Sequence, residues 1–266
     1  MQNEKEIKEV VKEKYGAIAQ KSQSGCGCGC GTSNKIVGYT VMKDDYTNLD
    51  GYIAEADLGL GCGLPTEYAG IKEGDTVVDL GSGAGNDVFV ARAIVGDKGK
   101  VIGLDFTEEM IDKANKNNLK LGYKNVEFWL GEIEEMPVDD SSADVVVSNC
   151  VLNLVPDKKK AFAEIFRILK PGGHFCVSDI VIKGELPANL KKSAEMYAGC
   201  VAGAVQQEEY LKIIDEAGFK NTEIEKTKVI ELPDEVLKQY LSTEEIELFR
   251  EKKTGIFSIT VTSYKP

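Results

Sequence analysis

Sulfur carries most of the chemistry that this 266-residue sequence offers, because it holds seven cysteines and a single histidine, His174. Most histidine-based catalysis and zinc binding is therefore excluded. Seven is an odd number and the chain is not small, so we expect no disulfide framework of the kind found in small secreted domains. Reduced thiols that bind a metalloid, act in catalysis or undergo redox turnover remain. The cysteines that these roles concern are Cys26, Cys28 and Cys30 in a glycine-rich run, Cys62 between two glycines, Cys150 after an apolar segment, and Cys200 among small residues.

Each cysteine also has a purely structural alternative, since a cysteine thiol is most often a small buried hydrophobe. We expect that role for Cys176, which lies inside an apolar segment. Cys62 and Cys150 instead lie at predicted loop–strand junctions, at the edge of the predicted sheet where ligands bind. Sequence spacing does not show whether they converge with Cys200, and the absence of a CxxC pair excludes a local zinc knuckle. Alternating glycines make residues 24–31 a predicted mobile loop, whose alternative role is opportunistic metal binding.

A glycine loop indicates a nucleotide site. Asp79–Gly85 reads DLGSGAG and lies between an apolar segment and a helical one, with the spacing G-x-G-x-G in place of the dinucleotide pattern G-x-G-x-x-G. Asp105 closes the next apolar segment, where a carboxylate can accept hydrogen bonds from both ribose hydroxyls. The alternatives are a structural turn for the loop and a carboxylate near a helix N-terminus for Asp105.

A further candidate binding segment, Gly131-Glu132-Ile133, follows the third apolar segment. An adenine would lie at this position. Together with the glycine loop and Asp105, this arrangement resembles the Rossmann-like S-adenosylmethionine-dependent methyltransferases. The candidate cofactor-binding residues are Asp79, Gly81, Ser82, Gly83, Gly85, Asn86, Asp105, Phe106, Gly131, Glu132, Ile133 and Asn149.

The elements that must position these residues follow from the hydrophobic pattern. Strands that alternate with helices of 10 to 15 residues are typical of a parallel sheet with helices on both faces. The expected strands are 76–80, 101–104, 126–130, 144–148 and 173–181, and the helices between them are 86–94, 108–121 and 157–169. After about residue 186 the pattern predicts helices over 189–204 and 207–217 and strands over 222–230 and 256–264, which suit an antiparallel edge of the same sheet or a small appended one.

The expected fold is therefore α/β, a Rossmann-like class I methyltransferase fold with a mainly parallel sheet, helices on both faces and a C-terminal α+β region. Residues 1–70 hold an amphipathic helix over 4–21, the cysteine-rich loop and a covering segment, in which Tyr39 and Tyr46 either line the donor site or simply pack. Residues 71–185 form the S-adenosylmethionine-binding domain. Residues 186–266 form a C-terminal region that closes the site.

Longer segments resemble the microbial arsenite methyltransferases, over a stretch from about Gly38 to Phe219. The glycine loop and LKPGG at residues 169–173 are common to many methyltransferases and discriminate little. The combination of GCG around Cys62, SNCVLNL around Cys150 and AGC at Cys200 is specific. The matching segments are 56–63, 79–87, 131–158, 169–173 and 198–210.

This resemblance implies that Cys62, Cys150 and Cys200 bind trivalent arsenic. Arsenic(III) is soft and thiophilic, so it prefers thiolates to imidazole or carboxylate. Three sulfurs leave the arsenic lone pair unshared, and this lone pair is the nucleophile that accepts the methyl group. No general base is required, which fits a chain with one histidine.

The family also has an N-terminal cysteine that shuttles a disulfide after arsenic is oxidised. This sequence has the triplet Cys26, Cys28 and Cys30 there, which leaves open which thiol serves. A second departure is Leu64, where relatives often have asparagine after GCG; it alters local hydrogen bonding and leaves the thiol in place.

Charge and composition restrict the partners. Asp and Glu total 44 against 32 Lys and Arg, a net charge of -12, which makes the chain a poor partner for nucleic acid. No run of about 18 apolar residues could span a membrane, and the first residues lack the layout of a signal peptide, so we expect a cytoplasmic protein. The resemblance implies arsenite or methylarsenite as substrate, S-adenosylmethionine as donor and glutathione or thioredoxin as reductant. We expect a monomer.

The sequence therefore predicts an arsenite methyltransferase, with two alternatives. One is an S-adenosylmethionine-dependent C-methyltransferase that acts on a quinone or sterol precursor, in which Cys150 only packs. The other is a thiol protein that binds arsenic without turnover, which leaves the glycine loop and Asp105 unexplained.

Overall fold

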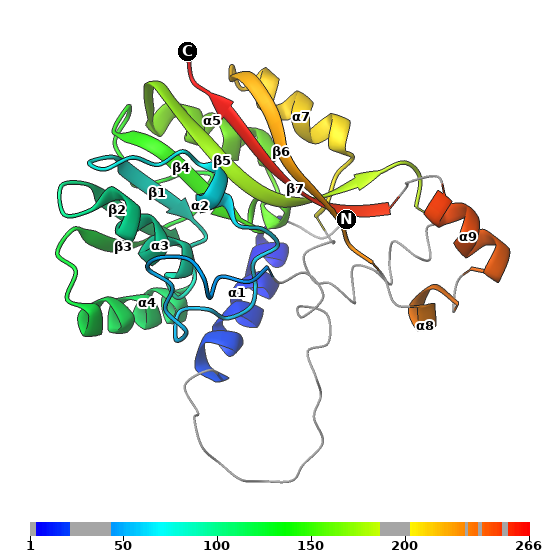
Figure 1. Cartoon of the computed structure of the whole chain (residues 1–266), viewed down its shortest axis with the longest axis horizontal. Helices are drawn as coiled ribbons and strands as arrows, with labels where there is room; N and C mark the ends of the chain where they lie inside the picture. Colours follow the sequence, from blue (N-terminus) through cyan, green and yellow to red (C-terminus); the bar gives the residue numbers. More distant parts are fainter. Residues whose placement is uncertain (1–3, 22–43, 187–202, 232–233, 239–240, 252–254) are drawn as a thin grey trace, which may run out of the picture.

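The computed structural model describes residues 4–21, 44–186, 203–231, 234–238, 241–251 and 255–266. Its framework is one seven-stranded sheet with the strand order β3-β2-β1-β4-β5-β7-β6 (Figure 1). The strands are β1 (Thr76–Leu80), β2 (Lys100–Asp105), β3 (Val126–Leu130), β4 (Ala143–Asn149), β5 (Leu169–Lys183), β6 (Lys220–Val229) and β7 (Gly255–Tyr264).

Parallel pairing joins β3, β2, β1, β4 and β5, and β7 runs antiparallel between β5 and β6. The predicted parallel sheet is therefore confirmed, and the two C-terminal strands form an edge of the same sheet. Leu80 at the end of β1 pairs with Leu104 of β2 and with Ser148 of β4. The loops that follow these three strands therefore meet at one edge, where the strand order reverses and ligands bind in α/β sheets.

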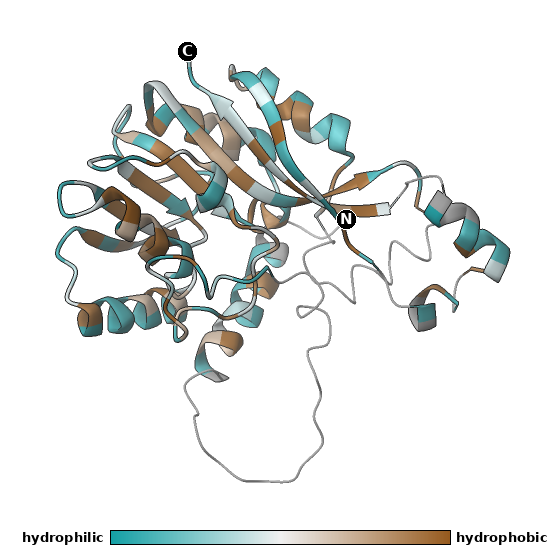
Figure 2. Ribbon diagram, viewed as in Figure 1, coloured by the Kyte–Doolittle hydropathy of each residue, from teal (hydrophilic) through white to brown (hydrophobic). Residues whose placement is uncertain are grey.

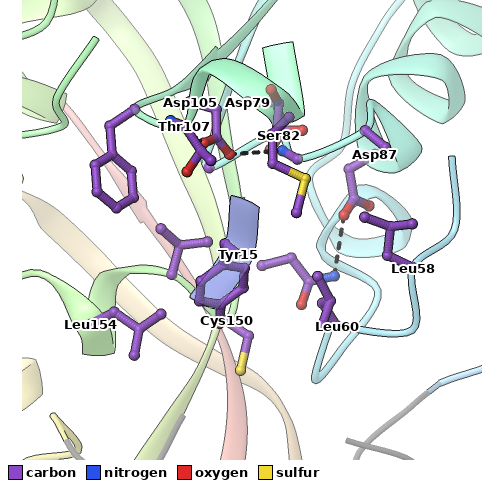
Figure 3. A pocket seen from close by; sticks show the side chains of 18 of the residues that line it. Tyr15, Leu58, Leu60, Asp79, Ser82, Asp87, Asp105, Thr107, Cys150 and Leu154 are labelled. Carbon is purple, nitrogen blue, oxygen red and sulfur yellow. Dashed lines mark hydrogen bonds between the residues drawn. The ribbon is translucent and has the colours of Figure 1, made fainter. Parts of the chain in front are cut away.

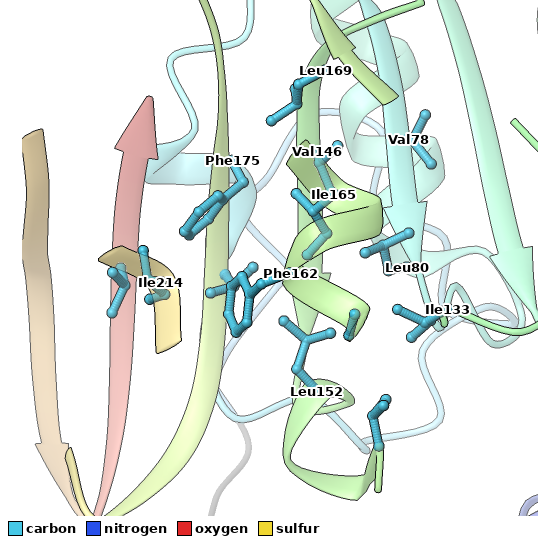
Figure 4. Packing of buried hydrophobic residues seen from close by; sticks show 14 of the residues in the cluster. Val78, Leu80, Ile133, Val146, Leu152, Phe162, Ile165, Leu169, Phe175 and Ile214 are labelled. Carbon is cyan, nitrogen blue, oxygen red and sulfur yellow. The ribbon is translucent and has the colours of Figure 1, made fainter. Parts of the chain in front are cut away.

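Helices cover both faces of the sheet, and consecutive strand residues point to opposite faces. Val77 packs with Phe89 of α3 on one face. Val78 belongs to the cluster on the other face, which includes Phe162 of α5 and Tyr210 of α7. Figure 4 shows Val78 and Phe162 within this cluster. Burial on both faces explains why the central strands β1 and β4 are mainly apolar along their length (Figure 2). The helices are α1 (Glu4–Lys21), α2 (Pro65–Tyr68), α3 (Asn86–Val95), α4 (Glu108–Leu121), the 3-10 turn η1 (Leu152–Leu154), α5 (Lys158–Ile168), α7 (Gln207–Glu216), α8 (Asp234–Leu237) and α9 (Thr243–Glu251).

Helix α1 has the predicted bounds and lies against α4. Lys12 Nζ is 3.7 Å from Glu108 Oε1, and a Cβ added to Gly16 would lie 3.1 Å from Glu109 Oε2. Close approach at Gly16 therefore brings the helix onto the N-terminal turn of α4, beside the loop that follows β2.

Two features of the C-terminal part differ from the sequence pattern. Most of the helix predicted over 189–204 lies outside the described residues, and Gly203 and Ala204 are not helical. The short helices α8 and α9 were not predicted. No helix in the described part of the chain is both long and apolar enough to cross a membrane.

Candidate active site

A pocket opens where the loops after β1, β2 and β4 meet. In the view of Figure 3, Asp79, Ser82 and Asp105 lie at one end of this pocket, and Cys150 and Leu154 lie at the other. The structure thus brings the glycine loop, the carboxylate that ends β2 and one candidate thiol into a single cavity. The predicted cofactor residues that line it are Asp79, Gly81, Ser82, Gly83, Asn86, Asp105, Phe106, Gly131, Glu132, Ile133 and Asn149.

Gly85 is the predicted cofactor residue that does not line the pocket. Its φ of +99° belongs to the left-handed region, and it caps the N-terminus of α3. A Cβ there would lie 2.8 Å from Phe89 and 2.9 Å from Phe128, so this glycine is needed for packing of α3 against the sheet. Gly83 differs, because the nearest atom to a Cβ placed on it is Met110 Sδ, at 3.9 Å.

Asp105 ties the glycine loop to the end of β2. Its Oδ2 accepts a hydrogen bond from the Gly83 N–H at 3.0 Å, and its Oδ1 accepts one from the Thr107 N–H at 2.9 Å. Burial raises the pKa of Asp105, and the backbone hydrogen bonds from Thr107 and Gly83 oppose that rise. A carboxylate oxygen can accept more than one hydrogen bond, so both oxygens retain capacity for ligand hydroxyls.

Two further buried carboxylates line the pocket beside Asp105. Burial raises the pKa of Asp79 well above its usual range, and the neighbouring charges of Asp87 and Asp105 add to that rise. Burial also raises the pKa of Asp87, to about 6, although hydrogen bonds from Asn149 and Tyr46 favour its charged form. Three carboxylates in one buried wall favour a cationic ligand, because a positive charge would relieve their mutual repulsion.

Asn149 connects this wall to the Cys62 loop. Its Oδ1 accepts a hydrogen bond from the Cys62 N–H at 2.9 Å. Its Nδ2 donates to Gly63 O at 2.9 Å and to Asp87 Oδ2 at 3.1 Å, the dashed line that ends at Asp87 in Figure 3. A Cβ on Gly61 would lie 2.6 Å from Asn149 Nδ2, so the glycine before Cys62 permits this contact.

Tyr46 completes the connection. Its hydroxyl lies 3.0 Å from both Asp87 carboxylate oxygens and 3.1 Å from Gly63 O, within reach to donate to either group. Asn149 Nδ2 donates in turn to the Tyr46 hydroxyl oxygen. Tyr46 lines the pocket and also packs in a buried cluster with Leu64 and Val90, so both arrangements considered for it from sequence are present. Tyr39 lies outside the described residues.

The two described candidate thiols share one apolar cluster next to the pocket. Cys150 follows β4 directly and lines the pocket; its N–H donates to Ser178 O at 2.7 Å. Cys62 does not line the pocket, and its carbonyl accepts a hydrogen bond from the Ser258 hydroxyl. Both are nearly inaccessible, at 2% for Cys150 and 1% for Cys62. The cluster comprises Cys62, Cys150, Ile180, Ile182, Ala204, Ile230, Leu237, Ile246 and Ile256.

The remaining cysteines fall in different classes. Cys176 is fully buried in the α3 face of the sheet, where burial raises the pKa of its thiol, and this confirms the expected core role. Cys26, Cys28, Cys30 and Cys200 lie outside the described residues. Of the predicted ligands, the structure therefore places Cys62 and Cys150.

Sequence reasoning missed the contribution of α1 to the pocket. Lys8, Val11 and Tyr15 line it, and Lys8 Nζ lies 2.6 Å from Glu132 Oε2 and 3.1 Å from Glu134 Oε1. The helical spacing predicted an apolar face without indicating its partner. Asp87 was also missed, although a carboxylate on the second residue of an otherwise apolar helix is a usable signal.

Comparisons with known proteins identify relatives of this chain. A family model described as a methyltransferase domain matches residues 71–218, more than half of the chain. Arsenite methyltransferase of Halobacterium salinarum is 42% identical over 229 residues, which cover 82% of this chain and 59% of the relative. Human arsenite methyltransferase is 30% identical over 264 residues, which cover 94% of this chain and 69% of the relative.

A solved structure extends the likeness to the fold. The crystal structure of an arsenic(III) S-adenosylmethionine methyltransferase from Chlamydomonas reinhardtii aligns with a TM-score of 0.63 at 31% identity, covering 88% of this chain and 75% of that one. The chain thus spans 59% of the Halobacterium relative's length. By the domain match and by its similarity to the human protein, this chain belongs to the methyltransferase-domain family and, within it, to the arsenite methyltransferase family.

Proposed function

We propose that this protein transfers a methyl group from S-adenosylmethionine to trivalent arsenic bound by Cys62, Cys150 and Cys200. The observation that carries the proposal is the shared cavity, because Cys150 lines the same pocket as the glycine loop and Asp105. A binding protein without turnover would not need the carboxylate-lined part of the pocket. A methyltransferase with a carbon acceptor would not need two thiols in one cluster beside it.

The pocket fits the proposed donor. Among the described residues, the buried Ser82 Oγ and Asn86 Oδ1 have no hydrogen-bond partner, which is costly unless a ligand supplies one. Both residues line the pocket, and the open side of Gly83 lets a ligand approach the backbone. Asp105 would accept hydrogen bonds from the ribose hydroxyls, and Asp79 and Asp87 would face the cationic part of the donor. When bound, S-adenosylmethionine supplies an electrophilic methyl group on a sulfonium centre.

The thiol cluster supports arsenic as the acceptor. Thiolates are the ligands that a soft centre prefers, and the isoleucines around Cys62 and Cys150 exclude competing water. The protein's main contribution is to orient two reactants, since an in-line displacement at carbon needs alignment more than proton transfer. The arsenic lone pair forms the new As–C bond as the C–S⁺ bond breaks, which leaves a neutral thioether and oxidises arsenic by two electrons.

A dithiol must return those two electrons for arsenic to become trivalent again. We assign this step to one of Cys26, Cys28 and Cys30 with a second protein thiol, and the resulting disulfide to reduction by glutathione or thioredoxin. Cysteine-dependent turnover of this kind requires a reducing compartment such as the cytoplasm. We propose arsenite and methylarsenite as substrates and a monomer as the working unit.

Methyl transfer from labelled S-adenosylmethionine tests the proposal. The protein is incubated with arsenite and glutathione, and in parallel with an unmethylated naphthoquinone acceptor, and the labelled products are separated. We expect label in methylated arsenic and none in the quinone. Label in the quinone alone would identify a C-methyltransferase, and arsenite binding without any transfer of label would identify a binding protein.

A further inference from the structure

Three buried polar side chains lie next to the turn formed by residues 150–155, here called the Cys150 turn. Asp179 belongs to β5, Lys158 begins α5 and Tyr210 belongs to α7, with exposed fractions of 1%, 8% and 0%. None of them lines the cofactor pocket, and the proposed methyl transfer uses none of them. Burial of polar groups is unfavourable without partners, so the contacts of this trio indicate its role.

The trio holds the backbone of Asn153 from two sides. Lys158 Nζ donates to Asn153 O at 3.0 Å and to Val155 O at 3.1 Å. The Asp179 carboxylate accepts a hydrogen bond from the Asn153 backbone N–H. Asn153 lies at the centre of η1, three residues after Cys150. Asp179 and Lys158 therefore bind the backbone N–H and C=O of the central residue of this turn.

The turn needs such support because of how it begins. Cys150 has a φ of +63°, in the left-handed region that L-residues with a Cβ rarely adopt. Its N–H donates to the carbonyl of Ser178, the residue before Asp179. Val151, Leu154 and Val155 of the same turn line the pocket, so its conformation also sets the cavity wall.

The same trio ties the turn to the C-terminal part of the chain. The Tyr210 hydroxyl donates to Asp179 Oδ2 at 3.0 Å, and its ring packs edge-on against Phe162 with centroids 5.6 Å apart. A Cβ on Gly203 would lie 1.7 Å from Asn153 O, so the main chain at residue 203 touches the turn directly. Residues 203–210 thus pack on the Cys150 turn through both Asn153 and Asp179.

We propose that Asp179, Lys158 and Tyr210 are positioning residues that hold the Cys150 turn in its binding conformation and connect it to residues 203–210. The inference rests on the proposed function, since it gives the trio a role in presenting Cys150 to arsenic. Loss of one member loosens the turn and exposes the Cys150 thiol. The hydrogen bonds that Asp105 accepts from Gly83 and Thr107 involve no member of the trio, so we expect this end of the pocket to change less than the Cys150 turn.

Thiol reactivity tests this role without requiring turnover. Tyr210→Phe keeps the ring and removes only the hydroxyl, and Lys158→Met removes the ammonium. Lys159→Met is the matched control, because this neighbouring lysine is exposed and pairs with Glu216. The native proteins are treated with iodoacetamide and alkylation is mapped by mass spectrometry. We expect Cys150 to react about tenfold faster in the first two variants, by local opening, with Cys176 unchanged. Lys159→Met should match the wild type.

Ligand affinities supply the second readout. Arsenite KM should rise about fivefold or more in Tyr210→Phe, whereas the Kd for S-adenosylmethionine should stay within about twofold. Equal acceleration at Cys150 and Cys176 would mean that the trio only stabilises the fold, and unchanged Cys150 reactivity in both variants would also overturn the inference. If the wild type does not methylate arsenite, the proposed function fails, and the alkylation contrast still decides the role of the trio.

Discussion

Replacing Asn149 by alanine should affect the arsenite site and the S-adenosylmethionine site to different degrees. The side chain was expected from sequence to contact the cofactor, and it does line the pocket. Its hydrogen bonds, however, go to the Cys62 N–H, Gly63 O, Asp87 and the Tyr46 hydroxyl, which makes it the connection between the thiol loop and the carboxylate wall. Asn149→Ala should therefore weaken arsenite binding far more than binding of S-adenosylmethionine.

The structure indicates the size of the effect. After Asn149→Ala, Gly63 O can still accept from the Tyr46 hydroxyl, but the part-buried Cys62 N–H loses its acceptor. A buried donor without a partner costs about 1–3 kcal/mol. If this free-energy cost displaces Cys62 from its binding position, arsenite affinity drops by roughly 5- to 150-fold, at 1.4 kcal/mol per factor of ten. The Kd for S-adenosylmethionine should change by about threefold at most, near 0.7 kcal/mol.

Isothermal titration with arsenite and, separately, with S-adenosylmethionine measures both affinities. Asn125→Ala is the matched control, because this amide also donates to two backbone carbonyls, those of Gly96 and Gly99, outside the pocket. The control should lower the unfolding temperature and leave both affinities unchanged. A large loss of donor affinity in Asn149→Ala with arsenite binding intact would refute this reading and return Asn149 to the role of a cofactor contact.

Three further predictions follow from the pocket. Asp105→Asn places an amide N–H₂ toward a backbone N–H of Gly83 or Thr107, so affinity for S-adenosylmethionine should fall by about 10- to 100-fold with arsenite affinity unchanged. Equal losses for both ligands would argue against a role of Asp105 in binding S-adenosylmethionine alone. The pKa of Asp87, raised by burial to about 6, means that its carboxylate is largely protonated at pH 5 and ionised at pH 7.5. A cation prefers the ionised form, so affinity for S-adenosylmethionine should strengthen as pH rises through this range. Affinity for the product S-adenosylhomocysteine, which lacks the sulfonium charge, should strengthen less. Parallel pH profiles for the two ligands in titration calorimetry would count against a contact between Asp87 and the sulfonium. Lys8→Glu reverses the ion pairs of α1 with Glu132 and Glu134, and should speed donor dissociation by up to about fivefold in stopped-flow measurements, with less effect at high salt; an unchanged rate at low salt would show that α1 does not retain the donor.

The sequence predicted the features that depend on local pattern. Apolar segments such as Thr76–Leu80 and the regular helices between them define the parallel sheet, because both faces of these strands are buried. The glycine loop and Asp105 were predicted for the same reason, since they end consecutive strands and must meet at one edge. Even β7 and the edge strand β6 followed from alternation of residue types, although the sheet to which they belong did not.

Contacts between distant segments were not predictable in this way. Tyr46 and Asn149 are 103 residues apart, and Lys8 and Glu132 are 124 residues apart, so no periodicity in the chain connects them. The placement of Cys62 behind the pocket wall, with Cys150 in that wall, depends on the left-handed backbone at Cys150 and on the Asn149 hydrogen bond. The buried Asp179 resembles any strand carboxylate in sequence, and its partners come from α7 and η1.

We propose that the pocket for S-adenosylmethionine delivers the methyl group to arsenic held by Cys62 and Cys150. A single-turnover experiment tests this most directly, with arsenite-loaded protein mixed with one equivalent of methyl-labelled S-adenosylmethionine and the arsenic products quantified over time. Wild type and Cys176→Ser should form labelled methylarsenic at similar rates, since Cys176 lies outside the pocket and outside the cluster that holds Cys62 and Cys150. Cys62→Ser and Cys150→Ser should form it at least about 100-fold more slowly, through loss of a thiolate ligand. Wild-type rates in Cys150→Ser, or equal impairment in Cys176→Ser, would contradict the account.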